Sequence, residues 1–557
     1  MGDCGSVVVG AVRRRRDVMV VVAGVFLMTF ITALDSSATM AIQPQVLSDF
    51  GAMARGGAVS VVTLLLQGGA RLGFTQAAVY FGYPAAGAGA LALHTAGFLA
   101  CAAAHSFAAL FAGTIVWGLG MTGFATLAAI AVADTLPLHL RGSVAAYASL
   151  PSILNYFLGV ELGGRLVRRW RWVYGALCIV AVACAAPIAL ALRRVVRRAL
   201  WKSGDADGAG PRPPWPRRLG RVLLEVDAPG LALITGGLLA LLAPIGLQAN
   251  AAHGWASAAM IAPLVTGAVT LAAAWYYEAR VARWPAVPGR LLRVRTMACA
   301  VAAATLFYYA LGVTLLYYNT YLQTAGGLSA HTAMLLEQGT SGVSVGLLAA
   351  GWAMQWSRRY RRWAGAGWAL ALLAAGLMTH SRGAAQSSKA EVVVVQLLFG
   401  TGAGLVVGSL GVGVQAAVAG ADVPIAISLF AMSEYVGCVL GQGTATAIWM
   451  NVLPARLASR LPSDVDVQRA INNLTYYQAL PSAQQTVVNN AYTHTQLLLT
   501  VCGICAITLA GAAMLGLEPL SLEPPPAPTP ASTPGDRDGD SLTSDTKDAR
   551  HVAPAEQ

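Results

Sequence analysis

Long apolar runs alternate with short polar segments over most of the chain. An apolar helix of about 20 residues crosses the hydrocarbon core of a bilayer, which is about 30 Å thick. Every backbone polar group inside that core needs an internal partner, which favours helices. We therefore predict an all-α polytopic membrane protein with fourteen transmembrane helices, over residues 18–40, 57–80, 83–104, 107–133, 142–163, 172–192, 229–249, 256–277, 296–321, 332–355, 363–380, 391–418, 424–450 and 494–517.

The composition supports this prediction. Of the 557 residues, 56% are hydrophobic and only 11% are charged, whereas soluble domains carry about 25% charged residues. The formal net charge of +12 does not indicate nucleic-acid binding, because the arginines lie in short blocks between apolar runs. The eight cysteines lie almost all within apolar runs and the histidines are scattered. We therefore expect no disulfide framework, no metal site, no cofactor and no enzymatic activity.

The distribution of Lys and Arg predicts the orientation. An even number of spans places both termini on one side, and the basic residues are concentrated in the segments on that side, which predicts cytoplasmic termini. A basic, proline-rich segment after six spans resembles a hinge between two bundles. We predict a 6+2+6 arrangement with a cytoplasmic N-terminus (1–17), a six-helix bundle (18–192), a basic linker (193–228), two inserted helices (229–277), a second six-helix bundle (278–517) with an outer loop at 452–493, and a disordered cytoplasmic tail (518–557).

One acid, Asp35, lies about two-thirds of the way through the first predicted span. An ionised carboxylate is expensive in hydrocarbon, so an acid at this depth indicates a pathway for protons, ions or substrate. The alternative is a structural acid that hydrogen-bonds to Ser36, Ser37 or Thr39 of its own turn. Because the polar run DSSAT would make a wet helix face, we favour a role in proton coupling.

Other charged residues are weaker candidates. Glu337 and Glu434 lie within later spans and are further candidates for proton coupling, unless they simply pack beside a polar neighbour. Asp134 ends the fourth span and Arg141 follows it, which is typical of a gating or structural ion pair. Arg171 belongs to a basic cluster on the predicted outer side, where we expect a structural role at the helix ends.

The ninth span is rich in tyrosine, with the sequence FYYALGVTLLYYNTYLQ. Tyr317 and Tyr321 are four residues apart and so share a helix face, and Tyr308 lies two to three turns earlier. Tyrosines offer a flat apolar surface with a hydroxyl group, which suits a large amphipathic ligand. An interfacial aromatic belt is the alternative. In the outer loop, a sequon at Asn473 predicts a glycosylation site in a eukaryotic host.

Several motifs resemble one known family in order and spacing. The sequence is similar to the siderophore–iron transporters of the major facilitator superfamily, in the fourteen-span branch known best from fungi, over roughly residues 30 to 515. The motifs are Leu34-Asp35-Ser36 with Gln43, Ala133-Asp134-Thr135 with Arg141-Gly142, Trp170-Arg171-Trp172 with Tyr174-Gly175, Val414-Gln415-Ala416, and Ala447-Ile448-Trp449 with Pro454.

The resemblance implies a major facilitator fold and the import of ferric siderophores by proton symport. It makes Asp35, Tyr317, Tyr321 and Tyr492 candidates for coupling or ligand contact, and Gln43 a candidate for substrate binding. We expect a monomer that binds a small-molecule chelate, protons and the lipid bilayer but no nucleic acid. Its membrane would be the plasma membrane or an endosomal or vacuolar membrane.

One motif departs from the superfamily pattern. The loop between spans two and three normally reads G-x-x-x-D-x-x-G-R, but here Val79 replaces the acid and Tyr83 the base of an ion pair that latches the outward-open state. The main alternative to import is a proton-coupled exporter of drugs or metabolites. The departure from the motif motivates a further alternative, a non-transporting sensor. Export is disfavoured because Leu150 precedes Pro151, where exporters usually carry a Gly-Pro pair.

Overall fold

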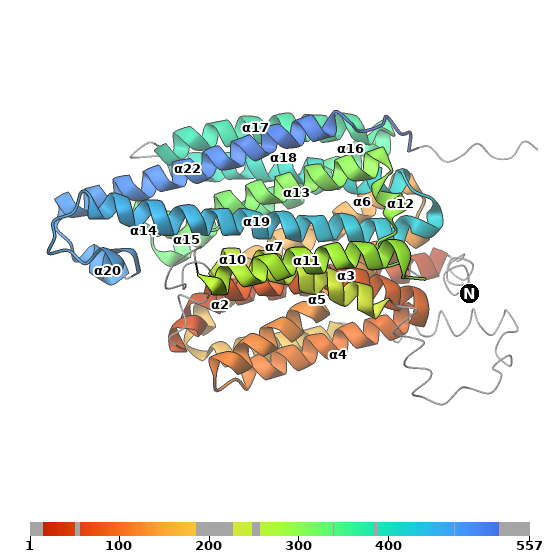
Figure 1. Ribbon diagram of the computed structural model, residues 1–557, viewed down its shortest axis with the longest axis horizontal. Coiled ribbons are helices and arrows are strands. Elements are labelled where there is room, and N and C mark those ends of the chain that lie inside the picture. Colours follow the sequence, from red (N-terminus) through yellow and green to blue (C-terminus); the bar gives the residue numbers. More distant parts are fainter. Residues whose placement is uncertain are drawn as a thin grey trace, which may run out of the picture. The chain divides into compact units, whose positions relative to one another are not determined.

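The computed structural model describes residues 15–50, 56–184, 227–247, 257–283, 285–337, 339–383, 388–472 and 474–522. These residues are almost entirely helical (Figure 1). The longer α-helices are α2 (Arg15–Asp49), α3 (Gly56–Phe81), α4 (Tyr83–Ala102), α5 (Phe107–Thr135), α6 (Leu138–Ala148), α7 (Leu150–Leu166), α10 (Ala228–Leu247), α11 (Ala258–Arg280), α13 (Arg295–Leu315), α16 (Gly339–Ser357), α17 (Tyr360–Gly383), α18 (Lys389–Ala416), α19 (Val423–Ala458) and α22 (Ser482–Met514). Short helices are α12 (Gly289–Leu292), α14 (Tyr318–Thr324), α15 (Ala330–Leu336), α20 (Val467–Asn472) and α21 (Leu474–Gln478).

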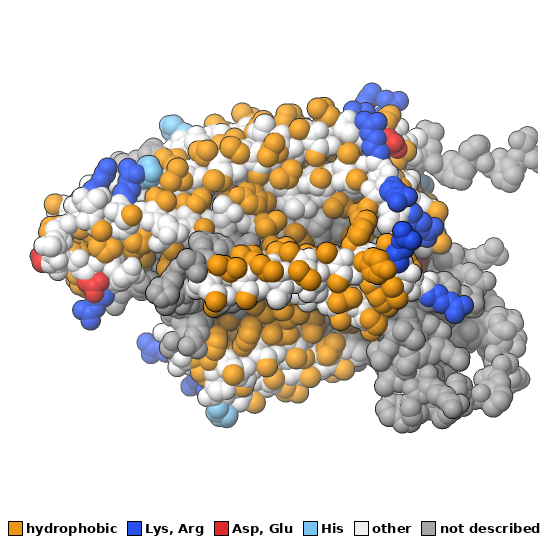
Figure 2. All heavy atoms as spheres, in the orientation of Figure 1, with side chains coloured by type: hydrophobic (Ala, Val, Ile, Leu, Met, Phe, Trp, Pro, Cys, Tyr) orange, Lys and Arg blue, Asp and Glu red, His pale blue; other side chains and the backbone are white. Residues whose placement is uncertain are grey.

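Many of these helices suit a membrane. Among the described residues, nine helices are long and apolar enough to cross a bilayer, and two further apolar helices, Trp170–Cys184 and Ala228–Pro244, are shorter. Figure 2 shows hydrophobic side chains along the flanks of the helices, with Lys and Arg gathered toward their ends. This is the surface expected of a protein that lipid surrounds. The number of fourteen spans, the 6+2+6 arrangement and the orientation stay predictions.

Three of the predicted spans are interrupted. Residues 142–163 are divided between α6 and α7 at Ser149, just before Pro151. A proline ring within a helix clashes with the carbonyl group four residues earlier, so the helix breaks here. The predicted span 296–321 is divided between α13 and α14, next to Tyr317. The predicted span 332–355 is divided between α15 and α16 at Glu337. Each break falls at a residue that the sequence singled out, or directly beside it.

Close packing of α4 against α5 depends on glycine. A Cβ atom on Gly97 would lie 2.1 Å from the backbone nitrogen of Trp117, and one on Gly120 would lie 2.4 Å from the backbone nitrogen of His94. Small residues let membrane helices approach until their backbones touch. This approach fixes the position of His94 on α4 relative to the bundle formed with α2 and α5.

Two apolar clusters form much of the buried interior. The larger joins α13, α16, α17, α18 and α22 and contains Phe307 and Phe399. A second cluster joins α2, α4, α5 and the helix Trp170–Cys184, and it contains Ile42 and Phe98. Phe98 of the second cluster and Phe124 of a smaller one lie against the polar pair described next.

Candidate functional site

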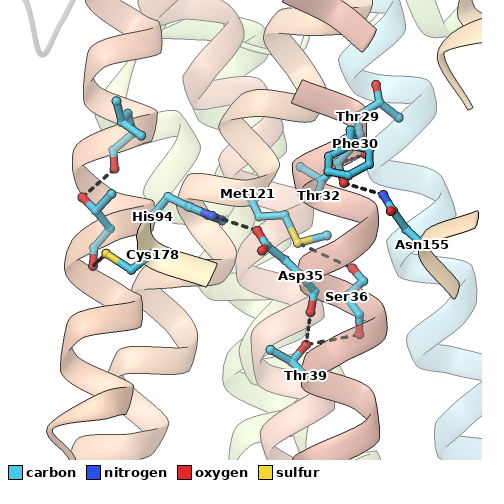
Figure 3. Close-up of polar contacts among 12 residues, drawn as sticks. Thr29, Phe30, Thr32, Asp35, Ser36, Thr39, His94, Met121, Asn155 and Cys178 are labelled. Carbon is cyan, nitrogen blue, oxygen red and sulfur yellow. Dashed lines mark hydrogen bonds and ion pairs between the residues drawn. The ribbon is translucent and has the colours of Figure 1, made fainter. Parts of the chain in front are cut away.

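Asp35 on α2 pairs with His94 on α4, inside the second apolar cluster. His94 Nε2 lies 2.9 Å from Asp35 Oδ2, and the two side chains are 0% and 1% exposed (Figure 3). The imidazole ring stands edge-on to Phe98 and Phe124, with ring centres 4.8 Å and 5.2 Å apart. Acid and imidazole therefore lie within contact distance of each other in surroundings that exclude water.

The hydroxyl groups of the turn around Asp35 bond elsewhere. Ser37 donates a hydrogen bond to the carbonyl group of Ala33, and Thr39 donates to the backbone oxygen of Asp35 rather than to its carboxylate. Ser36 points to the sulfur atom of Met121 (Figure 3). Among the described residues, neither carboxylate oxygen of Asp35 and neither ring nitrogen of His94 has a hydrogen-bond partner of good geometry, so the pair is a close contact of 2.9 Å rather than a formed hydrogen bond. The structural alternative from the sequence, an acid satisfied by its own turn, is therefore not what the structure has.

A cavity of about 320 Å³ begins one residue beyond this pair. It follows α2 from Ser36 to Leu47, toward the end of α2 opposite the N-terminus, and Gln43 lines it. Gln442 on α19 closes it from the other side. Gln43, which the sequence predicts to bind substrate, and Ser36, the neighbour of Asp35, therefore line the same cavity from the same helix, α2.

Glu337 belongs to a second buried polar cluster, between α14, α15 and α17. Asn319 Nδ2 donates a hydrogen bond of 3.3 Å to Glu337 Oε2. Arg382, which is 1% exposed, attracts Glu337 electrostatically, lies over the ring of Tyr318 at 4.3 Å and donates to Thr500. Its Nε and Nη2 atoms have no hydrogen-bond partner among the described residues. A buried arginine with spare donors stabilises a nearby negative charge.

Glu434 belongs to a third cluster, where α3 meets α13 and α19. It is attracted by Arg71 and hydrogen-bonded by Tyr308. Arg71 lies over the ring of Tyr435 at 5.3 Å, and its Nη2 atom is 3.5 Å from the hydroxyl oxygen of that residue. The structure therefore places Tyr308 beside an acid rather than in the cavity at Gln43.

The other predicted tyrosines lie in two places. Tyr317 stacks on Trp449 with ring centres 4.4 Å apart and donates to Thr446, while Tyr492 meets the other edge of Trp449 and is 0% exposed. Tyr321 instead donates to the carbonyl group of Arg382. Tyr321 donates its backbone N–H to the carbonyl group of Tyr317 at 3.0 Å, so the two residues are one helical turn apart on α14, although their side chains contact different neighbours. The shared helix face stays a prediction. Within the described part of the chain, none of the tyrosines predicted to bind substrate lines the cavity at Gln43.

The predicted gating residues also have specific partners. The Tyr83 hydroxyl group donates a short hydrogen bond to Asp134, so the tyrosine that replaces the base of the latch still contacts an acid. Arg141 donates to the side chain of Gln415 on α18 at 3.3 Å and to the carbonyl group of Leu136. Arg171 donates to the carbonyl group of Ala104. Arg141 thus connects α6 with α18, and the structural role of Arg171 stays a prediction.

Sequence reasoning missed three residues of these clusters: His94, Arg71 and Arg382. Each of the three lies in or at the end of an apolar run. For Arg71 and His94 this position could have identified them from the sequence, because charged or titratable groups in such runs mark functional sites. Their partners lie 45 to 364 positions away in the sequence. The glycosylation candidate Asn473, the basic linker and the tail beyond Leu522 lie outside the described residues.

Comparison with known proteins gives relatives but no matching family model. The chain is 26% identical over 524 residues to MFS siderochrome iron transporter C of Aspergillus fumigatus, which covers 91% of this chain and 85% of that protein. It is 26% identical over 519 residues to siderophore iron transporter mirC of Emericella nidulans, covering 91% and 84%. The solved structure of an auto-inhibited peptide transporter of the POT family matches with a TM-score of 0.55 and 15% identity, over 93% of this chain and 98% of that one.

The helical architecture and the relatives define a multi-pass integral membrane protein with a fold like that of the major facilitator superfamily. Proteins of this class are transporters and not enzymes. The chain is related to the fungal siderophore iron transporters of that superfamily.

Proposed function

We propose that this protein imports ferric siderophore chelates and that protons drive the import. The relatives named for siderochrome or siderophore iron transport, aligned over about nine-tenths of the chain, support the substrate class. The buried pair of Asp35 and His94 is the observation that carries the coupling mechanism. We further propose fourteen spans with cytoplasmic termini, which opens the cavity at Gln43 to the outside.

The pair suits proton coupling because a carboxylate and an imidazole, both of which can bind a proton, lie 2.9 Å apart inside the helices. When the pair binds a proton, its net charge is zero, either as two neutral groups or as a carboxylate beside an imidazolium. When that proton leaves, the carboxylate of Asp35 stays as a buried negative charge. A buried uncompensated charge is costly, so the two protonation states favour different packing of α2 against α4 and α5. Since α2 also carries Gln43, this packing change alters the cavity directly.

The test is uptake of radioactive iron, supplied as siderophore complexes, by cells that lack their own siderophore uptake. Expression of the chain should cause accumulation, and a protonophore should abolish it. Asp35→Asn should lose accumulation against a gradient while retaining exchange of bound substrate. Glu391→Gln is the matched control, because Glu391 also lies 3.0 Å from a histidine, His380, but at the surface.

The outcomes separate the functions. Absence of chelate uptake together with pumping of a dye out of the cells would identify an exporter and refute import. Full accumulation by Asp35→Asn would remove Asp35 from the coupling role but leave import intact. Binding of a chelate without movement of any chelate or dye, in protein that folds normally, would favour a sensor.

A further inference from the structure

A strongly basic cavity of about 850 Å³ lies where α16 ends and α17 begins. This is the end of the helices at which α2 begins and α22 ends (Figure 1). Its lining contains four arginines and the segment that follows α22: Arg358, Arg359, Arg361, Arg362 and residues 519–521, together with Trp356. The cavity is therefore separate from the polar clusters inside the helices.

The walls of this cavity are tied together by backbone contacts. Leu522 donates its backbone N–H to the carbonyl group of Arg358 at 3.1 Å, and Arg359 forms a β-bridge with Ser521. The buried Tyr360 donates its hydroxyl group to the carbonyl group of Glu518 at 2.5 Å. Arg358 adopts a left-handed backbone conformation with φ 54°, which is rare for residues other than glycine. These contacts hold the arginines in a formed site rather than on a loose loop.

The arginines in this cavity have positive charge to spare. The ion pairs among the described residues do not include any of the four. Arg358 Nη1 is buried without a hydrogen-bond partner in that part of the chain. The nearby acid, Glu518, accepts a hydrogen bond from Thr296 on α13 instead. A cluster of arginines with free planar donors is suited to phosphate oxygens.

The position of the cavity indicates what carries the phosphate. Trp352 and Trp356 stand side by side on α16, with ring centres 5.5 Å apart, and are 61% and 79% exposed. Tryptophan is enriched where the apolar part of a membrane meets the headgroups. Trp356 lines the cavity, so the arginines lie at the level of the lipid headgroups. A cavity of this size also accommodates more than a bare phosphate ion.

We propose that this cavity binds the phosphate-bearing headgroup of an anionic membrane lipid. The arginines contact the phosphate groups, the tryptophans border the glycerol region, and the acyl chains follow the apolar flanks of α16 and α17. Basic pockets between membrane helices on the cytoplasmic side bind anionic headgroups in this way. The site joins α16 and α17 to the segment after α22, so a bound lipid would stabilise all three together.

The purified full-length protein in detergent can be titrated with short-chain phosphatidylinositol 4-phosphate, with bound lipid measured by native mass spectrometry. The change Arg361→Gln with Arg362→Gln should weaken binding about 30-fold, because each basic residue near an anionic headgroup contributes about a fivefold factor. Arg293→Gln with Arg295→Gln is the matched control, since it removes two exposed arginines at the same end. Binding by the control should stay within about threefold of the unchanged protein.

Arg359→Gln is a second variant in case the double change disturbs folding, with an expected loss of about fivefold. Equal loss in the control pair would overturn the proposal, because nonspecific charge attraction would then explain the binding. Equally tight binding of soluble inositol phosphate would show that a free phosphate ester, and not lipid, is the ligand.

Discussion

Replacing His94 by Gln removes the partner of the most deeply buried acid in the described part of the chain. Asp35 is 1% exposed and lies 2.9 Å from His94 Nε2, and neither of its carboxylate oxygens has a hydrogen-bond partner of good geometry among the described residues. Glutamine keeps a hydrogen-bond donor at this place but does not titrate. The change therefore removes the proton-binding group of His94 while it keeps a polar side chain that fills part of the same space.

The expected size of the effect follows from burial. Removing one partner of a buried charged pair costs about 3–5 kcal/mol, because the remaining charge stays uncompensated. Asp35→Asn together with His94→Gln leaves no charge, and the two amides can bond to each other, so the double variant should cost less than the sum of the single ones. The coupling energy should be about 3 kcal/mol.

A double-mutant cycle of unfolding free energy in mixed micelles measures this coupling. The exposed pair of His380 and Glu391, with the same 3.0 Å nitrogen–oxygen distance, gives a matched cycle in the same protein. His380 is 76% exposed, so its coupling with Glu391 should be only about 0–1 kcal/mol. Accumulation of iron chelate, measured in parallel, should be lost in all three Asp35 and His94 variants and kept in the control variants.

Two results would refute the reasoning. If the effects of Asp35→Asn and His94→Gln add within about 0.5 kcal/mol, the two groups do not interact in the folded protein. If the double variant still accumulates chelate against a gradient, the pair is structural and the proton uses another route.

Two further predictions concern packing and the altered latch. Gly120→Ala should destabilise the protein by about 1–3 kcal/mol, because the added Cβ atom would lie 2.4 Å from the backbone of His94. Thermal unfolding measures this loss. Gly89→Ala is the control and should have no effect, because the added atom meets open space. Tyr83→Phe should cost about 1–3 kcal/mol by leaving the half-buried oxygen of Asp134 without its donor. An unchanged unfolding temperature in Tyr83→Phe would show that this contact no longer acts as a latch.

The sequence by itself determined the class of structure. Apolar runs of membrane length can satisfy their backbone groups only as helices, so the helical fold follows from hydropathy alone. The same reasoning singled out Asp35, because an acid is conspicuous in hydrocarbon. Gln43 followed from the family resemblance, and the structure places it in the wall of the cavity beside Asp35.

Only the tertiary structure decided which polar groups meet. His94 looked isolated in the sequence because its partner lies on another helix, and the approach of α4 and α5 at Gly120 helps to position it. Tyr317 and Tyr321 are one helical turn apart, yet Tyr317 stacks on Trp449 and Tyr321 donates to the carbonyl group of Arg382, partners that helical periodicity does not specify. Hydropathy reports how each segment meets lipid, whereas pairing depends on how helices rotate and cross, and local sequence does not specify those angles.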